Sequence, residues 1–531
     1  MVSGAIKSLR QINQKKRLFP EGSLSIRSAP YLVRKKFLRC RSPFLSRHSR
    51  ARLVLVMAMP CLTACRPQAE LDVTTPIVPS TFAELVDKRA CAPTNWLDLF
   101  GSPELSRLIV RAQADNLDIA AAVARVRQAN AQTQISRAAL DPQISSTASL
   151  SRFQAPGTSV YTQGPFKPET DYMFFPAVNA SYELDFWGKY RDATKAGLLN
   201  EQVSRFDKDV VALATIASVV TNYLTMLAAG DLLRIAQQDV DIAETVLKAE
   251  KERLSAGTAN GLDVAQEESV VASQRASLPP LEQQLRQSRN ILVVLTGRTP
   301  ESASIKGGGL DALHSPPLRV GIPSQLVLRR PDIAEAEAKL ASAKASVDQA
   351  RAAFFPDIQL TGQAGLESLV LKNLLTPQAI AASLVADVTQ PIFSGYQLEG
   401  RLALSKAQYE ESLQNYRKTI IQALADVENA LIAVHESAEH ERLQRMAVAA
   451  ARKAYDGAIQ QLHEGTIDIT TVLNTQRNLF QAETLLVQVR LQYLQAFVTL
   501  YQALGGGWTS ENLPVKLGHL PDADGILGFS Q

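Results

Sequence analysis

The sequence predicts a mixed α and β fold in which one unit of helices and strands occurs twice along the chain. Matching residues recur at nearly constant separations, which indicates an internal duplication. Short segments alternate between apolar and polar residues, as strands do, and long proline-free tracts rich in Ala, Gln, Leu and Val favour helices. At 531 residues we expect two domains or one extended architecture.

The basic character of the chain belongs to its N-terminal segment. The formal net charge is +4, but 14 Lys and Arg residues and a single acid precede Leu53. The rest of the chain has 42 basic and 51 acidic residues, a net charge near −9. A nucleic-acid partner needs a basic surface, so we expect no nucleic-acid binding.

A targeting segment follows this basic stretch. The apolar run from Leu53 to Cys61 is too short to span a bilayer as a helix. It leads into Leu62-Thr63-Ala64-Cys65, which resembles the bacterial lipobox, where a signal peptidase cuts before a lipid-modified cysteine. We therefore predict lipidation of Cys65; an ordinary secretory signal with a chance cysteine is the alternative.

No segment after this signal is expected to form a transmembrane helix, because none approaches eighteen consecutive apolar residues. An exported chain without such a helix either stays soluble or enters the membrane through β-strands.

The two halves of the chain match in register. Asp118-Ile119-Ala120 matches Asp332-Ile333-Ala334 at an offset of 214 residues. Further along the offset is 208, and the matched pairs are Leu254 with Leu462, Gly257 with Gly465, Thr258 with Thr466, Val264 with Val472 and Gly297 with Gly505. Chance similarity would not keep its register over such lengths.

This duplication defines the predicted domains. They are a basic extension and lipoprotein signal peptide (1–64), an N-terminal tether (65–101), a first repeat (102–310), an inter-repeat linker (311–331), a second repeat (332–508) and a C-terminal tail (509–531).

Each repeat contains the same elements in the same order. The first is predicted to have a helix over 102–140, strands at about 143–153 and 173–186 around a Pro/Gly/Thr-rich loop, and a long helical hairpin with its tip near 257. The second has a helix, strands at about 356–367 and 380–390, and a hairpin with its tip near 465. Pro279-Pro280 is expected to break or kink the returning helix of the first hairpin.

The strands at about 173–186 and 356–367 each alternate between an apolar and a polar face, and the alternation at 380–390 is weaker. Four strands are too few to close a membrane barrel alone, since about eight is the smallest number seen. If they span lipid, several chains must pool them, and three copies would give twelve. A soluble four-stranded sheet with one dry face is the alternative.

Sequence motifs for catalysis are missing. There is no His-Glu-x-x-His, no Gly-x-Ser-x-Gly, no phosphate-binding glycine loop and no paired cysteines. We therefore predict no enzyme activity, no metal site and no cofactor. The Arg329-Arg330 pair is interpreted as structural, meeting nearby carboxylates.

Three stretches carry a resemblance to a known family. They are Val320-Gly321-Ile322-Pro323-Ser324 with Leu328-Arg329-Arg330-Pro331-Asp332-Ile333, then Tyr182-Glu183-Leu184-Asp185-Phe186-Trp187-Gly188, and Trp96-Leu97-Asp98-Leu99-Phe100. On these residues the chain resembles the TolC-like outer-membrane factors, specifically the OprM/NodT-type efflux lipoproteins.

The resemblance implies a homotrimer lodged in the lipid of the outer membrane. Each protomer would give four strands to a twelve-stranded outer-membrane β-barrel and its long helices to a periplasmic α-helical barrel. A periplasmic adaptor (membrane fusion) protein and an inner-membrane RND-type pump would be its partners.

The resemblance also assigns candidate sites. Gly257 and Thr258, and likewise Gly465 and Thr466, would form the periplasmic tips where the adaptor docks. Relatives often have an aspartate ring near the aperture, but the expected position holds Asn474. Asp263 and Asp468 lie close by and are the other candidates for lining the aperture, because a threefold axis turns one inward carboxylate into a ring of three.

The function implied is a passive, trimeric exit duct that expels drugs or other small toxic compounds through a tripartite efflux system. A TolC-type duct for type I protein secretion is the first alternative. A soluble coiled-coil adaptor or scaffold is the second.

Overall fold

The computed structural model describes residues 100–154, 170–302, 305–315 and 329–508. The predicted signal peptide and Cys65, nearly all of the tether, the loop over 155–169, most of the linker and the C-terminal tail lie outside the described residues.

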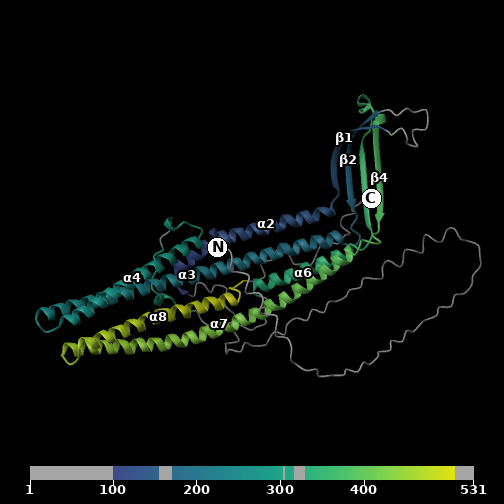
Figure 1. Ribbon diagram of the computed structural model, residues 1–531. Helices are drawn as coiled ribbons and strands as arrows, with labels where there is room; N and C mark the ends of the chain where they lie inside the picture. Colours follow the sequence, from purple (N-terminus) through teal and green to yellow (C-terminus); the bar gives the residue numbers. More distant parts are fainter. Residues whose placement is uncertain (1–99, 155–169, 303–304, 316–328, 509–531) are drawn as a thin grey trace, which may run out of the picture. The chain divides into compact units, whose positions relative to one another are not determined.

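The structure has the predicted duplication (Figure 1). The helices and strands of the first repeat are α1 (Pro103–Asp115), α2 (Leu117–Arg137), β1 (Gln143–Gln154), β2 (Thr170–Glu183), α3 (Lys189–Ser255) and α4 (Gly261–Leu295). Those of the second are α6 (Pro331–Ala352), β3 (Asp357–Leu366), β4 (Ile380–Thr389), α7 (Gln397–His463) and α8 (Ile469–Ala503). Helices α3 and α7 each have 67 residues, and α4 and α8 each have 35, so the offset of 208 found in the sequence reflects two hairpins of equal length.

The helix predicted over 102–140 is two helices, α1 and α2, followed by a 3₁₀ turn. The break lies at Asn116, whose extended backbone ends α1 and whose side chain accepts hydrogen bonds from the backbone N–H groups of Asp118 and Ile119. An Asn side chain satisfies the free N–H groups at a helix start, so it favours a new helix here over a continuous one.

The two repeats have the same junction, where the end of the returning helix meets the segment just before the first helix that leads to the strands, α2 in one repeat and α6 in the other. Gly297, just after α4, has a φ of 71°, and an added Cβ there would collide with the backbone carbonyl of Asp115. Gly505, just after α8, has a φ of 87°, and its Cβ would collide with the carbonyl of Arg329. Only glycine combines this backbone conformation with so close an approach, which explains why both positions match in the sequence.

A break or a kink was predicted at Pro279-Pro280, and the break is wrong: α4 is one helix from Gly261 to Leu295 with both prolines inside it. The prolines remove two backbone donors, but α4 packs along α3, and this packing holds the helix together across them.

Helix α3 lies at the centre of the helical part and packs against α2, α4, α6 and α8, whereas α7 packs against α6 and α8 (Figure 1). The main core unites residues far apart in the sequence. Its largest members that are almost fully buried include Phe100, Leu105, Leu224, Leu292, Leu494 and Tyr501.

Helix α3 alone, among the described residues, is long and apolar enough to cross a membrane by length and composition: an 18-residue window has a mean hydropathy of 1.8. This differs from the expectation that no such segment follows the signal. That expectation counted uninterrupted apolar residues, whereas α3 has no charge between Asp209 and Asp231. Many of its apolar side chains, such as Val220 and Leu224, belong to the main core, and 44% of the window is buried.

The four strands form one antiparallel sheet in the order β1-β2-β3-β4 (Figure 1). Three strands start and end within a residue of the prediction. Strand β2 lies three residues earlier than predicted, because the chain turns after Glu183 and begins α3 at Lys189.

Candidate functional site

The register of the sheet sorts its side chains into two chemically different faces. Residues that are directly opposite in an antiparallel pair share a face. One face carries the row Ile144, Ala180, Gly362 and Leu384, and the two rows beside it are apolar except for Ser146 and the hydroxyl of Tyr182. Its exposed members include Ile144, Leu150, Val178, Ile380, Leu384 and Val388.

The opposite face has a polar, hydrogen-bonded middle, although Phe175 and Val385 also lie on it. It carries the row Ser145, Asn179, Gln363 and Ser383. The Asn179 amide donates to Thr147 Oγ1 at 3.0 Å, and the Gln363 amide donates to Asn179 Oδ1 at 2.9 Å. A sheet with one exposed apolar face and one wet face is what a lipid-facing, water-lined wall requires.

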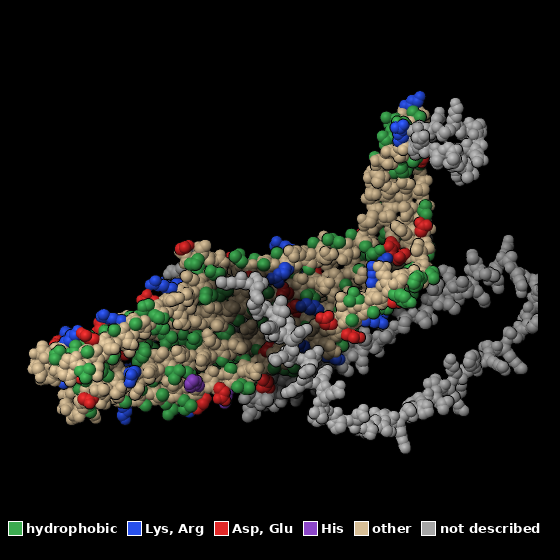
Figure 2. Space-filling model, in the orientation of Figure 1, with side chains coloured by type: hydrophobic (Ala, Val, Ile, Leu, Met, Phe, Trp, Pro, Cys, Tyr) green, Lys and Arg blue, Asp and Glu red, His purple; other side chains and the backbone are tan. Residues whose placement is uncertain are grey.

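Charged residues lie only near the strand ends. They occupy positions 152, 171, 183, 357 and 387, each within three residues of an end of its strand. Figure 2 shows the corresponding contrast between the middle of the sheet, where few charged side chains are visible, and the helices, along which they are spread. The uncharged stretches between these positions are close in length to a membrane-spanning strand, which has about 9–11 residues.

Both outer strands of the sheet leave an edge unpaired within the described residues. β1, with 12 residues, and β4, with 10, each pair with one neighbour, so alternate residues along each strand direct their backbone N–H and C=O groups to the unpaired side. Unpaired edges in a membrane wall must find partners, and the chain offers two edges of similar length.

The sheet is fixed to the helices at the start of α3. Lys189 Nζ lies 2.8 Å from Glu183 Oε1 and 3.2 Å from Asp357 Oδ1, so it bridges β2 and β3. The Trp187 ring stacks on Phe355 at 4.8 Å and donates its Nε1–H to the carbonyl of Pro356 at 2.9 Å. The Tyr-Glu-Leu-Asp-Phe-Trp-Gly stretch singled out in the sequence is therefore a strand-to-helix corner.

The predicted tips are the turns that end α3 and α7. Gly257 and Gly465 have φ values of 75° and 71°. The Thr258 N–H donates to the Arg253 carbonyl at 2.9 Å, and the N–H of Thr466 makes the equivalent bond to Gln461 at 3.0 Å. These are glycine helix stops of one type, repeated in both hairpins.

Both threonines add a second bond to the same carbonyl. Thr258 Oγ1 donates to Arg253 O at 3.1 Å, and Thr466 Oγ1 donates to Gln461 O at 3.1 Å. All four Gly and Thr residues are exposed, and an added Cβ at either glycine would meet nothing within 4 Å. The turns thus present open surface.

The three candidate aperture residues all take part in local hydrogen bonds. Asp263 accepts from the Asn260 N–H in a capping box at the start of α4. Asp468 caps α8 by accepting from the Thr471 N–H and hydroxyl, and Asn474 accepts from Arg477. Asp468 is the repeat equivalent of Asn260, at the offset of 208, so Asp263 and Asp468 are not equivalent positions.

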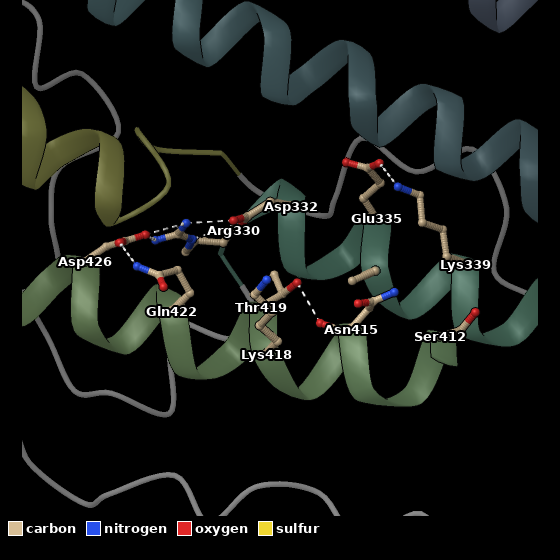
Figure 3. Close-up of a pocket in the computed structure, with 11 residues that line it drawn as sticks. Arg330, Asp332, Glu335, Lys339, Ser412, Asn415, Lys418, Thr419, Gln422 and Asp426 are labelled. Carbon is tan, nitrogen blue, oxygen red and sulfur yellow. Dashed lines mark hydrogen bonds and ion pairs between the residues drawn. The ribbon is translucent and has the colours of Figure 1, made fainter. Parts of the chain in front are cut away.

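The Arg330 side chain is structural, as interpreted from the sequence. It lies at one end of a pocket of about 510 Å³ between α6 and α7 and binds Asp332 and Asp426 (Figure 3). It also donates to the carbonyl of Ala503 at 3.1 Å, at the end of α8. These carboxylates raise the pKa of Arg330 against the opposing effect of burial.

Elsewhere in the pocket Lys339 is paired with Glu335 (Figure 3). Within the described residues, no three His, Cys, Asp or Glu side chains are grouped so that they could hold a metal ion.

The sequence reasoning missed a set of buried acids in the first hairpin. Asp239, Glu250 and Glu267 are 5%, 3% and 1% exposed. The signal was available, because Glu267 falls between the buried Val264 and Val271 at the spacing of one helix face.

The model of one protein family, described as outer membrane efflux protein, matches residues 108–298 and 322–506, one stretch for each repeat. The chain is 38% identical over 464 residues to the pyoverdine export outer membrane protein OpmQ of Pseudomonas aeruginosa, covering 86% of this chain and 97% of that protein. It is 33% identical over 419 residues to the toluene efflux pump outer membrane protein TtgC of Pseudomonas putida, covering 79% and 86%.

Among solved structures, a membrane protein from Pseudomonas aeruginosa matches with a TM-score of 0.75 at 27% identity, covering 81% of this chain and 98% of that one. Both halves of the sequence, most of its length and the arrangement of helices and strands thus agree with one family, as the resemblance predicted. The chain belongs to the outer membrane efflux protein family.

Proposed function

We propose that this protein is the outer-membrane exit duct of a tripartite efflux system and works as a homotrimer. The observation that carries the proposal is the four-stranded sheet with an apolar face, a hydrogen-bonded polar face and two unpaired edges. Three copies joined edge to edge make a twelve-stranded barrel with the apolar face toward lipid and the polar face toward water. The long helices of the three copies continue the passage into the periplasm.

The duct is passive. It performs no catalysis, and the transport energy comes from an inner-membrane RND-type pump that reaches it through a periplasmic adaptor. The exposed Gly257-Thr258 and Gly465-Thr466 turns are the docking surface for the adaptor. Asp263, Asp468 and Asn474 follow these turns closely enough to line the aperture.

The proposed cargo is a small molecule. A pyoverdine exporter and a toluene efflux protein are both close in sequence, and pyoverdine export belongs to the relative with the higher identity. The identity to the pyoverdine exporter therefore adds a siderophore-like molecule to drugs and solvents as a candidate cargo. Type I protein secretion has no such support among these relatives.

Cys65 is the proposed lipid anchor, on the strength of its lipobox-like context. Metabolic labelling with a palmitate analogue tests it: the wild type incorporates label and Cys65→Ser does not. Labelling of the variant would overturn the anchor while leaving the duct untouched.

The duct is tested by fractionation and export. The protein is expected in the outer membrane as a heat-labile trimer, and recovery as a soluble monomer would contradict the proposal. A deletion strain is assayed for susceptibility to drugs and solvents, for secreted siderophore and for secreted protein, and the assay that changes identifies the cargo. Replacing Gly257 or Gly465 with Val is expected to impair export while trimers persist; unchanged export would refute the tip assignment.

A further inference from the structure

Glu267 of α4 is a carboxylate buried without any hydrogen-bond partner. Its side chain is 1% exposed, and neither Oε1 nor Oε2 is hydrogen-bonded. Every other buried acid in the described residues has at least one partner, whether an Arg, an amide or a backbone N–H: Glu201, Asp231, Asp239, Glu250 and Glu441. An ionised carboxylate in such a place is unstable, because burial removes water and nothing replaces it.

Two neighbouring carboxylates further disfavour the ionised form of Glu267. On α3, the helix along which α4 packs, Glu250 gives one oxygen to Arg253 at 2.7 Å and leaves Oε2 without a partner. Asp239, further along α3, likewise has an unbonded Oδ2. Burial first, and then the negative charges of Glu250 and Asp239, raise the pKa of Glu267 to about 7.

The ion pairs around this part of the hairpin do not include Glu267. Lys251 pairs with Glu268 and Arg275 with Glu244, both across α3 and α4. Around Asp239, Gln476 and Glu483 approach from α8 and Tyr455 from α7, and Glu483 is bound by Arg452. None of these cations is bonded to Glu267.

The second hairpin provides a comparison within the same chain. At the offset of 208, the equivalents of Asp239, Glu250 and Glu267 are Ala447, Ala458 and Thr475. The two hairpins have helices of equal length, so the fold does not need acids at these positions. Buried acids at these three positions belong to the α3–α4 hairpin alone, and the buried acid of α7, Glu441, is paired with Arg445 and Arg490.

We propose that the α3–α4 hairpin is a pH-responsive segment, in which Glu267 holds a proton while α4 is packed on α3 and releases it when α4 moves away into water. The packed hairpin then weakens as pH rises from the ordinary range of a glutamate toward neutrality. The α7–α8 hairpin lacks the acids and does not share the response. In each protomer the packing of α4 on α3 would weaken as pH rises, while the packing of α8 on α7 would not change.

Hydrogen–deuterium exchange on the detergent-solubilised full-length protein tests this, with rates corrected for the intrinsic pH dependence of exchange. Release of one proton predicts that the opening equilibrium of the segment over 240–275 rises about tenfold between pH of about 6 and about 8. The segment over 448–483 is the internal reference and is expected to change little.

Glu267→Gln removes the titrating group and should abolish the tenfold rise. Glu268→Gln changes the exposed neighbour and should keep it. An equal response in both hairpins, or a response that persists in Glu267→Gln, would overturn the proposal. If Glu267→Gln fails to assemble, Glu250→Gln decides: removing that charge must move the midpoint of the response to lower pH, and an unmoved midpoint counts against Glu267.

Discussion

Gln476 of α8 donates a hydrogen bond from Nε2 to Oδ1 of Asp239 on α3 at 3.0 Å, with both side chains buried. This bond links the two hairpins of the protomer through side chains. Burial raises the pKa of Asp239, and the hydrogen bond from Gln476 works in the opposite direction. The bond therefore stabilises the charged form of an acid that packing alone would disfavour.

Gln476→Ala should destabilise the protein by about 1–3 kcal/mol, because it leaves the Asp239 carboxylate buried with no partner. Thermal unfolding followed by circular dichroism measures the loss. Asp239→Asn keeps an acceptor for Gln476 and removes the charge, so it should cost less than Gln476→Ala.

Gln495→Ala is the matched control. The Gln495 amide donates to Thr225 Oγ1 at 3.2 Å between the same two helices, but the bond is only partly buried and joins neutral groups. Removing this hydrogen bond should lower the free energy of unfolding by about 0.5–1.5 kcal/mol. The interpretation is wrong if Gln476→Ala is no more harmful than Gln495→Ala.

Two kinds of glycine with positive φ should respond differently to alanine. Gly297→Ala and Gly505→Ala place a Cβ against a backbone carbonyl, so the junction must shift, and we expect a loss of more than about 3 kcal/mol or failure to assemble. Gly257→Ala and Gly465→Ala meet open space and lose only about 1–2 kcal/mol from the left-handed backbone conformation. Yield of folded protein and thermal midpoints of the four variants, measured side by side, distinguish the cases; similar losses at all four would contradict the junction geometry.

Arg330 and Asn116 occupy equivalent positions in the two repeats. Each donates a hydrogen bond to a carbonyl at the end of the returning helix, one from a charged guanidinium and the other from a neutral amide. Arg330 donates to the carbonyl of Ala503 at 3.1 Å, and the Asn116 amide donates to that of Leu295 at 2.9 Å. Arg330→Met also removes the cation that pairs with Asp332 and Asp426, which keep only the hydrogen bonds from the Ile333 N–H and the Gln422 amide, so we expect a loss of about 2–3 kcal/mol.

Asn116→Ala removes a neutral bond and a helix cap, and it should cost about 1–2 kcal/mol. Arg330→Lys should rescue little, because an ammonium cannot make the fork of contacts that the guanidinium makes. Denaturant unfolding of the three variants checks the order, which would be contradicted if Arg330→Lys behaved like the wild type.

Much of the fold could be predicted because duplication and alternation are local signals. The glycines at 257, 297, 465 and 505 kept their spacing because each stops a helix with a positive φ. Strand faces followed from period two for the strands at about 173–186, 356–367 and 380–390, and in the paired register of β2, β3 and β4 the residues predicted to share a face do so.

What could not be predicted depended on contacts between segments. The break at Asn116 is tied to the approach of Gly297, which is 181 residues away in the chain. The continuity of α4 across its two prolines depends on α3 lying alongside. The spacing of Glu267 between Val264 and Val271 places it on one helix face with them, but an acid on a helix is ordinarily solvated, and only the packing of α4 on α3 shows that this one is buried.

The titration of Glu267 should contribute to the pH dependence of the protein's stability. Its pKa is about 7 in the folded protein against an ordinary value of 4.5. Below about 4.5 both folded and unfolded chains are protonated, so the site has no effect on stability. Between about 4.5 and 7 the folded chain holds a proton that the unfolded chain has lost, so stability falls as pH rises and levels off above about 7. A shift of this size corresponds to about 3 kcal/mol.

Other carboxylates titrate in the same range, so the quantity to measure is the difference in thermal midpoint between wild type and Glu267→Gln across pH. That difference should grow in favour of the variant from about pH 4.5 to about 7 and then stay constant. Glu268→Gln, which changes an exposed acid paired with Lys251, should show no such trend. A difference that is flat with pH, or that grows toward acid, would mean that Glu267 is not protonated when α4 is packed on α3.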